Sequence, residues 1–201
     1  MLILEDLARG TVTRLLGEME SGNEDALGEL IPLVYSELRA LANRQRGRWQ
    51  GDFTLNTTAI VHEAYQKLVD QKGLAAASRS HFLAIASKAM RHILCNYARD
   101  KGRQKRGGDL QRVTMDAVLE GPGQVALSDE HSEVLTLLDE ALVRLEQIDS
   151  RQGKIVECRF FGGLTIEDTA AAVGVSPATV KREWALARAR LFRDMQPHLE
   201  T

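Results

Sequence analysis

Apolar residues recur at steps of three and four positions along most of the chain, and this spacing predicts amphipathic helices. The first clear stripe consists of Leu27, Leu30, Ile31, Val34, Leu38 and Leu41. It predicts a helix over residues 31–46, and similar stripes predict helices over about 56–68 and 81–100. Helical spacing resumes near residue 133, and two more helices are expected after residue 150. Alternating runs typical of strands are nearly absent, so we expect an all-α fold.

Breaks in this pattern predict two small helical domains. Residues 1–106 form the first and residues 131–201 the second. Glycine, proline and acidic residues are frequent in residues 107–130, which are therefore expected to be a flexible acidic linker.

The composition is typical of a soluble globular protein: 201 residues, of which 44% are hydrophobic and 27% charged. No apolar run approaches the roughly 20 residues that span a bilayer. The first residues carry no basic, apolar leader, so we expect a cytoplasmic protein without membrane contact. Cys95 and Cys158 lie far apart in helical contexts and are expected to be buried thiols.

The charge is strongly segregated along the chain. Residues 81–112 carry a net charge of +6, and residues 113–150 carry −8. A basic block of this kind favours polyanionic partners even in a slightly acidic protein.

The strongest local signal lies near the C-terminus. Thr165 and Asp168 form a capping-box pattern ahead of a short apolar segment. Gly174 supplies a tight turn, and Ser176 followed by Pro177 is typical of the start of a second helix. The order of helix, glycine turn and capped helix predicts a helix-turn-helix.

The second of these helices separates its two faces. Its apolar residues at helical spacing are expected to face the core: Val180, Trp184, Ala187 and Leu191. Small and basic residues occupy the other face: Ala178, Lys181, Arg182, Ala185 and Arg188. Such a face suits insertion into the major groove of DNA.

These motifs resemble a known family. The segments FFGGLTIEDTA (residues 160–170) and GVSPATVKR (residues 174–182) are similar to region four of bacterial sigma factors of the sigma-70 class. The resemblance is to the extracytoplasmic-function (ECF) group. The segments LVYSELR (33–39), AIVHEAY (59–65) and HFLAIASKAMR (81–91) are similar to region two. The order and spacing of the motifs agree from about residue 11 to residue 195.

The resemblance implies a sigma factor that binds RNA polymerase core and directs promoter recognition and transcription initiation. Region two would bind the polymerase clamp helices and open the −10 element, and region four would read the −35 element and contact the flap. It also implies an anti-sigma factor or a Ser/Thr kinase as possible regulators. We expect a monomer when the protein is free.

The resemblance also assigns candidate residues. The −35 contacts of region four are Ser176, Thr179, Lys181, Arg182 and Arg188. The −10 contacts of region two are Ser78, Arg79, Ser80, His81, Lys88, Arg91, Arg99, Lys101 and Arg103. The polymerase contacts are Leu55, Ile60, Val61, Glu63, Tyr65 and Leu68.

The chain departs from the family where the clamp-binding helix begins. Many members carry clustered carboxylates there, but this chain has Asn56, Thr57 and Thr58, with only Glu63 acidic nearby. In one interpretation the contact is mainly apolar, and Thr57 or Thr58 caps the helix. In the other, phosphorylation of a threonine restores negative charge at a helix N-terminus.

The acidic block allows two hypotheses. Residues 113–150 could fold over basic surfaces of the free protein and reduce DNA binding, with Asp116, Glu120, Asp129 and Glu130 as the groups to test. In the second hypothesis, which we favour, the linker passes through a basic channel of the polymerase and has no effect in the free protein.

Other function classes have little support. His62 and Glu63 lack a second histidine at the four-residue step of a metalloprotease helix, and no phosphate loop or nucleophile elbow is present. We therefore expect no enzyme activity, no metal and no cofactor. The alternative function is a helix-turn-helix transcriptional regulator that acts without being a polymerase subunit.

Overall fold

The computed structural model describes residues 2–23, 25–47, 49–50, 55–70, 76, 78–104, 127–128 and 132–199. The helices of the N-terminal half are α1 (Leu2–Glu20), α2 (Asp25–Gly47), α3 (Thr57–Asp70) and α4 (Arg79–Gln104). Those of the C-terminal half are α6 (Ser132–Ile148), α7 (Ser150–Val156), the π-helical turn η2 (Glu157–Phe161), α8 (Ile166–Val173) and α9 (Pro177–Leu199).

The prediction of an all-α fold is confirmed, because the described residues are almost entirely helical. The two short strands β1 (Trp49–Gln50) and β2 (Leu127–Ser128) add a parallel pairing of two residues each. This pairing joins a segment after α2 to a segment before α6. It is too short to change the fold class.

The structure adds helix where the sequence pattern predicted less. α1 was not predicted, although it buries Val12, Leu15 and Leu16. α2 begins at Asp25, six residues before the predicted start, and contains Pro32. Proline inside a helix removes one backbone donor. Tertiary packing outweighs this cost, because the turns before Pro32 bury Leu27 and Leu30.

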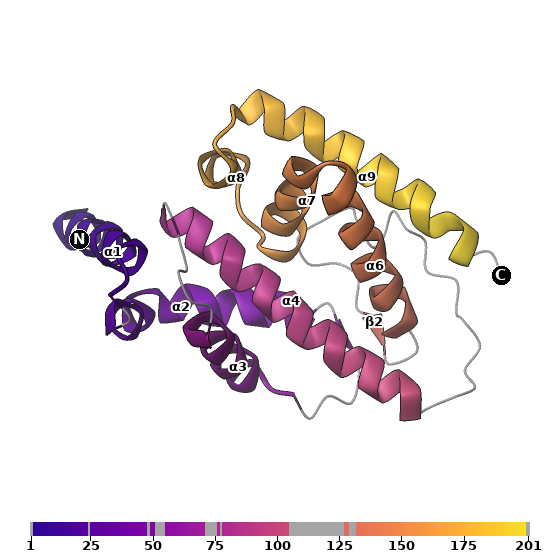
Figure 1. Cartoon of the computed structure of the whole chain (residues 1–201), viewed down its shortest axis with the longest axis horizontal. Coiled ribbons are helices and arrows are strands. Elements are labelled where there is room, and N and C mark those ends of the chain that lie inside the picture. Colours follow the sequence, from indigo (N-terminus) through magenta and orange to yellow (C-terminus); the bar gives the residue numbers. More distant parts are fainter. Residues whose placement is uncertain are drawn as a thin grey trace.

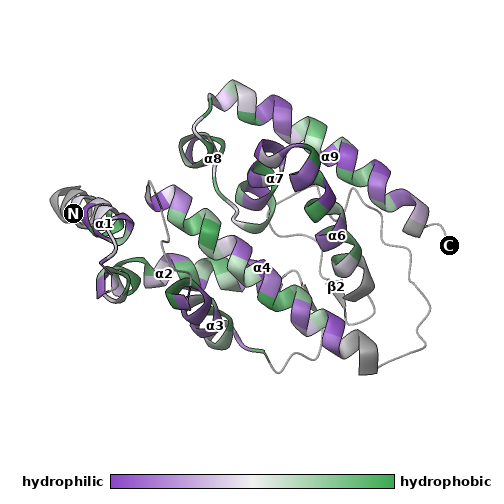
Figure 2. Cartoon of the chain, in the orientation of Figure 1, coloured by the Kyte–Doolittle hydropathy of each residue, from purple (hydrophilic) through white to green (hydrophobic). Residues whose placement is uncertain are grey.

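Helix α4 lies at the centre of the molecule (Figure 1). It packs against α2 and α3 on one side and against α6, η2 and α8 on the other. Hydrophobic and hydrophilic residues alternate along its length (Figure 2). Because the helix is packed on two sides, it carries apolar side chains on both of them.

One continuous hydrophobic core joins the two halves. It includes Phe82 and Met90 of α4 together with Leu138, Leu142 and Phe161 of the C-terminal half. The predicted linker, residues 107–130, lies outside the described residues except for Leu127 and Ser128. The domain boundaries therefore stay a prediction, while the packing between the halves is a structural finding.

Three described glycines have a positive φ, a backbone conformation that favours glycine, and two of them, Gly163 and Gly174, lie in the C-terminal half. Gly163 has φ +60°, and a Cβ there would lie 2.8 Å from Arg44 Nε. Gly174 has φ +74° with open space around it. Gly17 of α1 also has open space, but it has no positive φ.

Gly163, Gly174 and Gly17 allow a matched stability test. Gly174→Ala should lower the free energy of unfolding by about 1–2 kcal/mol, the cost of a left-handed alanine. Gly163→Ala should cost more, because Arg44 must also move. Gly17→Ala should raise stability by about 0.5–1 kcal/mol. Urea unfolding followed by circular dichroism measures all three, and a Gly174→Ala variant as stable as the parent would contradict the assignment.

Candidate nucleic-acid interface

The predicted helix-turn-helix is confirmed as α8, a glycine turn and α9. Thr165 Oγ1 accepts a hydrogen bond from the backbone N–H of Asp168 at 3.0 Å and caps α8. Gly174 ends α8 in the left-handed conformation, and its N–H donates to Ala170 O at 2.9 Å. Short-range hydrogen bonds thus define where α8 begins and where it ends.

Two of the predicted −35 residues cap the second helix. Ser176 Oγ accepts from the backbone N–H of Thr179 at 3.2 Å, and the two hydroxyl oxygens lie 2.9 Å apart. The predicted core side of α9 is confirmed, because Val180, Ala187 and Leu191 are buried.

The other face of α9 is open to solvent. Ala178, Lys181, Arg182 and Ala185 are exposed, and 68% of the Arg182 side chain is accessible. Arg188 is half-buried, and its guanidinium carbon lies 6.0 Å from the centre of the Trp184 ring. This face can bring donors and positive charge to a DNA groove without moving the core.

A polar cluster joins the buried side of α9 to α7, and the sequence did not predict it. Buried Glu183 accepts from Gln152 Nε2 at 3.0 Å and pairs with Arg151 at 3.2 Å. The hydrogen bond from Gln152 lowers the pKa of Glu183, so the carboxylate stays charged. Gln152 Oε1 in turn accepts from Arg190 at 3.1 Å. The only sign of this cluster in the sequence is Glu183, an acidic residue within a basic helix.

Comparison of the sequence with models of known protein families agrees with this geometry. The family model described as "ECF sigma factor" matches residues 9–197. The chain belongs to the ECF sigma factor family. Proteins of this family act in promoter recognition and transcription initiation. A search of curated proteins found no significant match to this sigma factor.

Four of the residues predicted to contact −10 DNA lie together at the start of α4. Ser78 Oγ accepts from the backbone N–H of His81 at 3.1 Å, so Ser78 caps the helix. Arg79 forms an ion pair with Glu37 of α2. Its hydrogen bond and charge outweigh burial and hold the pKa of Glu37 below its usual value. Ser80 and His81 are half-buried beside them.

Farther along α4, three predicted −10 residues face the C-terminal half of the chain. Lys88 Nζ lies 2.8 Å from Glu146 Oε2, and Arg99 Nη2 lies 2.7 Å from Asp139 Oδ2. Arg91 is only 1% exposed. The prediction that Arg91 faces DNA is therefore wrong for this conformation, because tertiary packing places its guanidinium inside the protein.

Two more residues of this set lie at the end of α4. The backbone of Lys101 and Arg103 continues the helix. Their side chains fall outside the described part of the chain. Their proposed contacts with phosphates stay predictions.

Arg91 is the centre of a buried ionic cluster. It pairs with Asp139 of α6, and its Nη2 lies 2.6 Å from Glu157 Oε1 of η2. Its guanidinium carbon also lies 5.4 Å from the centre of the Phe161 ring. Burial raises the pKa of Glu157 to about 7 despite the opposing charge of Arg91. Neither Glu157 oxygen accepts a well-aligned hydrogen bond from the described residues.

Half of the predicted polymerase contacts lie in the core. Ile60 and Leu68 are at most 2% exposed, so in this conformation their side chains stabilise the fold, whereas Val61 is 5% exposed and lines a pocket. Apolar spacing marks a buried face without saying what covers it, and the role of these residues in binding polymerase stays a prediction. Glu63 is exposed, whereas Tyr65 and Leu55 are half-buried.

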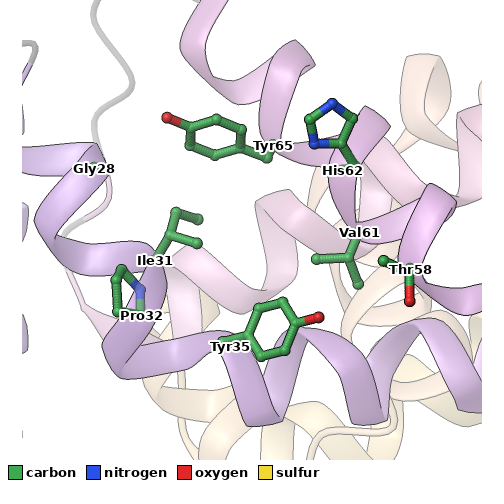
Figure 3. Close-up of a pocket in the computed structure, with 8 residues that line it drawn as sticks. All are labelled: Gly28, Ile31, Pro32, Tyr35, Thr58, Val61, His62 and Tyr65. Atoms are coloured by element: carbon green, nitrogen blue, oxygen red, sulfur yellow. The ribbon is translucent and has the colours of Figure 1, made fainter.

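Side chains of α2 and α3 line an apolar pocket of about 250 Å³ (Figure 3). Its lining residues are Gly28, Ile31, Pro32, Tyr35, Thr58, Val61, His62 and Tyr65. Tyr35 is 40% exposed, so the apolar lining of the pocket is partly open to solvent. The resemblance assigned no polymerase contact to the α2 residues of this pocket, although Tyr35 lies in one of its motifs, residues 33–39.

The start of α3 corrects one interpretation of the threonines. Asn56 Oδ1 accepts from the backbone N–H of Ala59 at 2.8 Å, so Asn56 is the capping residue. Thr57 Oγ1 donates to Asn43 Oδ1 of α2 at 2.6 Å. Thr58 is exposed at the pocket rim. Neither threonine supplies the helix cap.

Three further observations concern the cysteines, membrane-spanning helices and metal ligands. Cys95 and Cys158 are buried free thiols, as predicted, and burial raises the pKa of Cys158 to about 12. No described helix is both long enough and apolar enough to cross a membrane. Within the described residues, no group of three or more His, Cys, Asp or Glu side chains could hold a metal ion.

The ring of His92 gives a pH-dependent test of the environment around Arg91. Burial, followed by the charge of Arg91, lowers the pKa of His92 to about 4. Between pH 6.5 and 4 the unfolded chain therefore binds a proton that the folded chain does not, and the free energy of unfolding falls as the pH falls. Glu157, with its raised pKa, contributes the opposite slope between about pH 7 and 4.5.

The variant His92→Gln separates the two slopes. As the pH falls from 7 to 5, the free energy of unfolding of the variant should rise relative to that of the parent by about 1 kcal/mol. This value allows for the half-exposed ring. Urea unfolding at each pH measures this difference. A parent and variant with parallel pH profiles would contradict the lowered pKa of His92.

Proposed function

We propose that this protein is the sigma subunit of RNA polymerase holoenzyme in the cytoplasm. Residues 1–106 would bind core polymerase and the −10 element, and residues 131–201 would bind the −35 element. The helix-turn-helix with its exposed basic face on α9 carries this proposal. The family match over residues 9–197 adds the role in transcription initiation.

The exposed apolar surface of α2 and α3 is our proposed contact with the polymerase clamp helices. It consists of the pocket and its rim, and includes Ile31, Tyr35 and Tyr65. Glu63 is the one predicted acidic contact, so apolar burial rather than charge would supply most of the affinity. This surface keeps Val61, which lines the pocket, and replaces buried Ile60 and Leu68 as the candidate.

Thr58 is the better placed of the two candidate phosphorylation sites. It is exposed at the pocket rim, whereas Thr57 is half-buried and hydrogen-bonded to Asn43. A phosphate at the start of α3 would gain from the helix dipole and add negative charge beside the proposed clamp contact. We propose a Ser/Thr kinase as the partner for this site. An anti-sigma factor, a family partner, would compete with polymerase for the same surfaces of a monomeric chain.

Co-elution with bacterial RNA polymerase core on a sizing column at moderate salt tests the sigma assignment. The unphosphorylated parent should co-elute with core. Tyr35→Glu should reduce co-elution, because it places a charge on the apolar surface. Thr13→Glu adds the same charge on exposed α1 and serves as the control.

A Thr57→Glu/Thr58→Glu variant runs beside the parent. Co-elution of this variant alone would assign polymerase binding to the phosphorylated form. Failure of both would overturn the sigma assignment and favour the helix-turn-helix regulator, which binds duplex DNA without polymerase.

Lys181→Ala/Arg182→Ala tests the DNA face of α9. Binding of a mixed-sequence duplex should weaken several-fold, and the slope of log affinity against log salt should fall by about one for each lost phosphate contact. Lys154→Ala removes an exposed charge from α7 and is the control. Fluorescence anisotropy over a salt series measures both effects, and equal slopes in all variants would exclude this face.

A further inference from the structure

Two arginines from different helices share one buried carboxylate beside the exposed face of α9. Arg151 Nη2 of α7 lies 3.2 Å from Glu183 Oε1, and Arg182 Nη2 of α9 lies 3.3 Å from the same oxygen. The two nitrogens therefore cannot be farther apart than the sum of these distances. We call Arg151, Arg182 and Glu183 the two-arginine site. The resemblance assigned Arg182 to DNA but gave Arg151 no role.

Contacts with α7 fix the carboxylate in place. Only 6% of the Glu183 side chain is exposed, and its other oxygen accepts a hydrogen bond from Gln152 Nε2 at 3.0 Å. Gln152 lies in the first turn of α7, where its backbone N–H donates to the capping oxygen Asp149 Oδ1 at 3.1 Å. Glu183 thus offers both arginines a partner whose position is set by the packing of α7 against α9.

Both arginine side chains remain accessible to solvent. The Arg151 side chain is 49% exposed and the Arg182 side chain 68%. A guanidinium carries several N–H donors in a planar fork, and the hydrogen bond to Glu183 comes from Nη2 in each arginine. The two groups can therefore bind a second acceptor without leaving the carboxylate.

The charge around the two-arginine site favours an anion. Arg190 Nη1 donates to Gln152 Oε1 at 3.1 Å and brings a third guanidinium to this cluster. The carboxylates of the same cluster are Glu183 and Asp149, and Asp149 is engaged in capping α7. Because the three arginines outnumber these two carboxylates, the cluster as a whole is positively charged.

A DNA phosphate is the anion that suits this position. Two neighbouring guanidinium groups match an oxyanion with two free oxygens, which every backbone phosphate of DNA has. Phosphates border the major groove, which the exposed face of α9 is proposed to enter. Arg151 belongs to α7, which packs against α9, and so it can reach the backbone from a second helix (Figure 1).

We propose that Arg151 is a phosphate-binding residue, and that Arg151 and Arg182 together hold one backbone phosphate of duplex DNA. Glu183 is a positioning residue, because it keeps two like charges side by side before DNA arrives. A phosphate held from two helices fixes the register of α9 along the groove. This inference rests on the DNA-binding part of the proposed function, and it does not require the chain to be a polymerase subunit.

Binding of a mixed-sequence duplex by the full-length chain tests the role of Arg151. Arg151→Ala should weaken binding several-fold, because a phosphate contact is lost. Arg151→Lys should retain most of the affinity, since an ammonium group also neutralises a phosphate. Lys154→Ala removes an exposed cation one turn later on the same helix and should bind as the parent does. Fluorescence anisotropy measures the affinities, and circular dichroism confirms that each variant is folded.

The double variant Arg151→Ala/Arg182→Ala shows whether one phosphate is shared. The slope of log affinity against log salt reports the number of phosphates that the protein neutralises. Loss of one shared phosphate should lower the slope by about one, whereas loss of two separate phosphates would lower it by about two.

A double-mutant cycle tests the positioning role of Glu183. Arg151→Ala should cost less affinity in the Glu183→Gln protein than in the parent, because the two arginines are no longer aligned there. Glu183→Gln also removes a negative charge, which by itself favours DNA. The cycle cancels this contribution, since both proteins being compared lack the same carboxylate.

Each result supports or overturns a defined part of the proposal. Equal affinities of Arg151→Ala and Lys154→Ala would overturn the phosphate contact, and a slope lowered by about two in the double variant would overturn its sharing. An equal cost of Arg151→Ala in both backgrounds would overturn the positioning role. If Lys181→Ala/Arg182→Ala also binds as the parent does, the proposed DNA face fails as well. If that variant binds weakly while Arg151→Ala does not, only the present inference fails.

Discussion

The buried charge of Arg91 is the interaction on which the arrangement of the two halves depends. A guanidinium that is 1% exposed is stable only if carboxylates and an aromatic face replace water around it. Asp139 and Glu157, both from the C-terminal half, supply the carboxylates, and Phe161 supplies the ring. Removing the C-terminal half from α4 therefore exposes apolar surface and leaves this charge to be hydrated.

The contact of α4 with α6 and η2 combines ion pairs with apolar packing, and the ion pairs make it specific. The ion pairs select one register of α6 along α4, since Lys88 and Arg99 meet Glu146 and Asp139 at opposite ends of the contact. Water can replace these partners when the halves separate, whereas the apolar residues need another covering.

The two candidate DNA surfaces differ in what determines their exposure. The face of α9 is set by local interactions: a serine cap, a glycine turn and buried Val180. It is exposed in the conformation described. The cations of α4 are paired with carboxylates of the C-terminal half, so their accessibility is a property of the whole fold.

The sequence by itself determined the features that depend on neighbours a few residues apart. Helical periodicity, the caps at Thr165 and Ser176 and the turn at Gly174 are local, and they sufficed for the fold class, the helix-turn-helix and the family. Tertiary structure alone decided which apolar residues of α3 are covered and which cations are free. Ile60 and Val61 look like an interface in the sequence, and Arg91 looks like a DNA contact. Their roles depend on helices distant in the chain, because burial and charge pairing between the two halves are long-range contacts that no local pattern encodes.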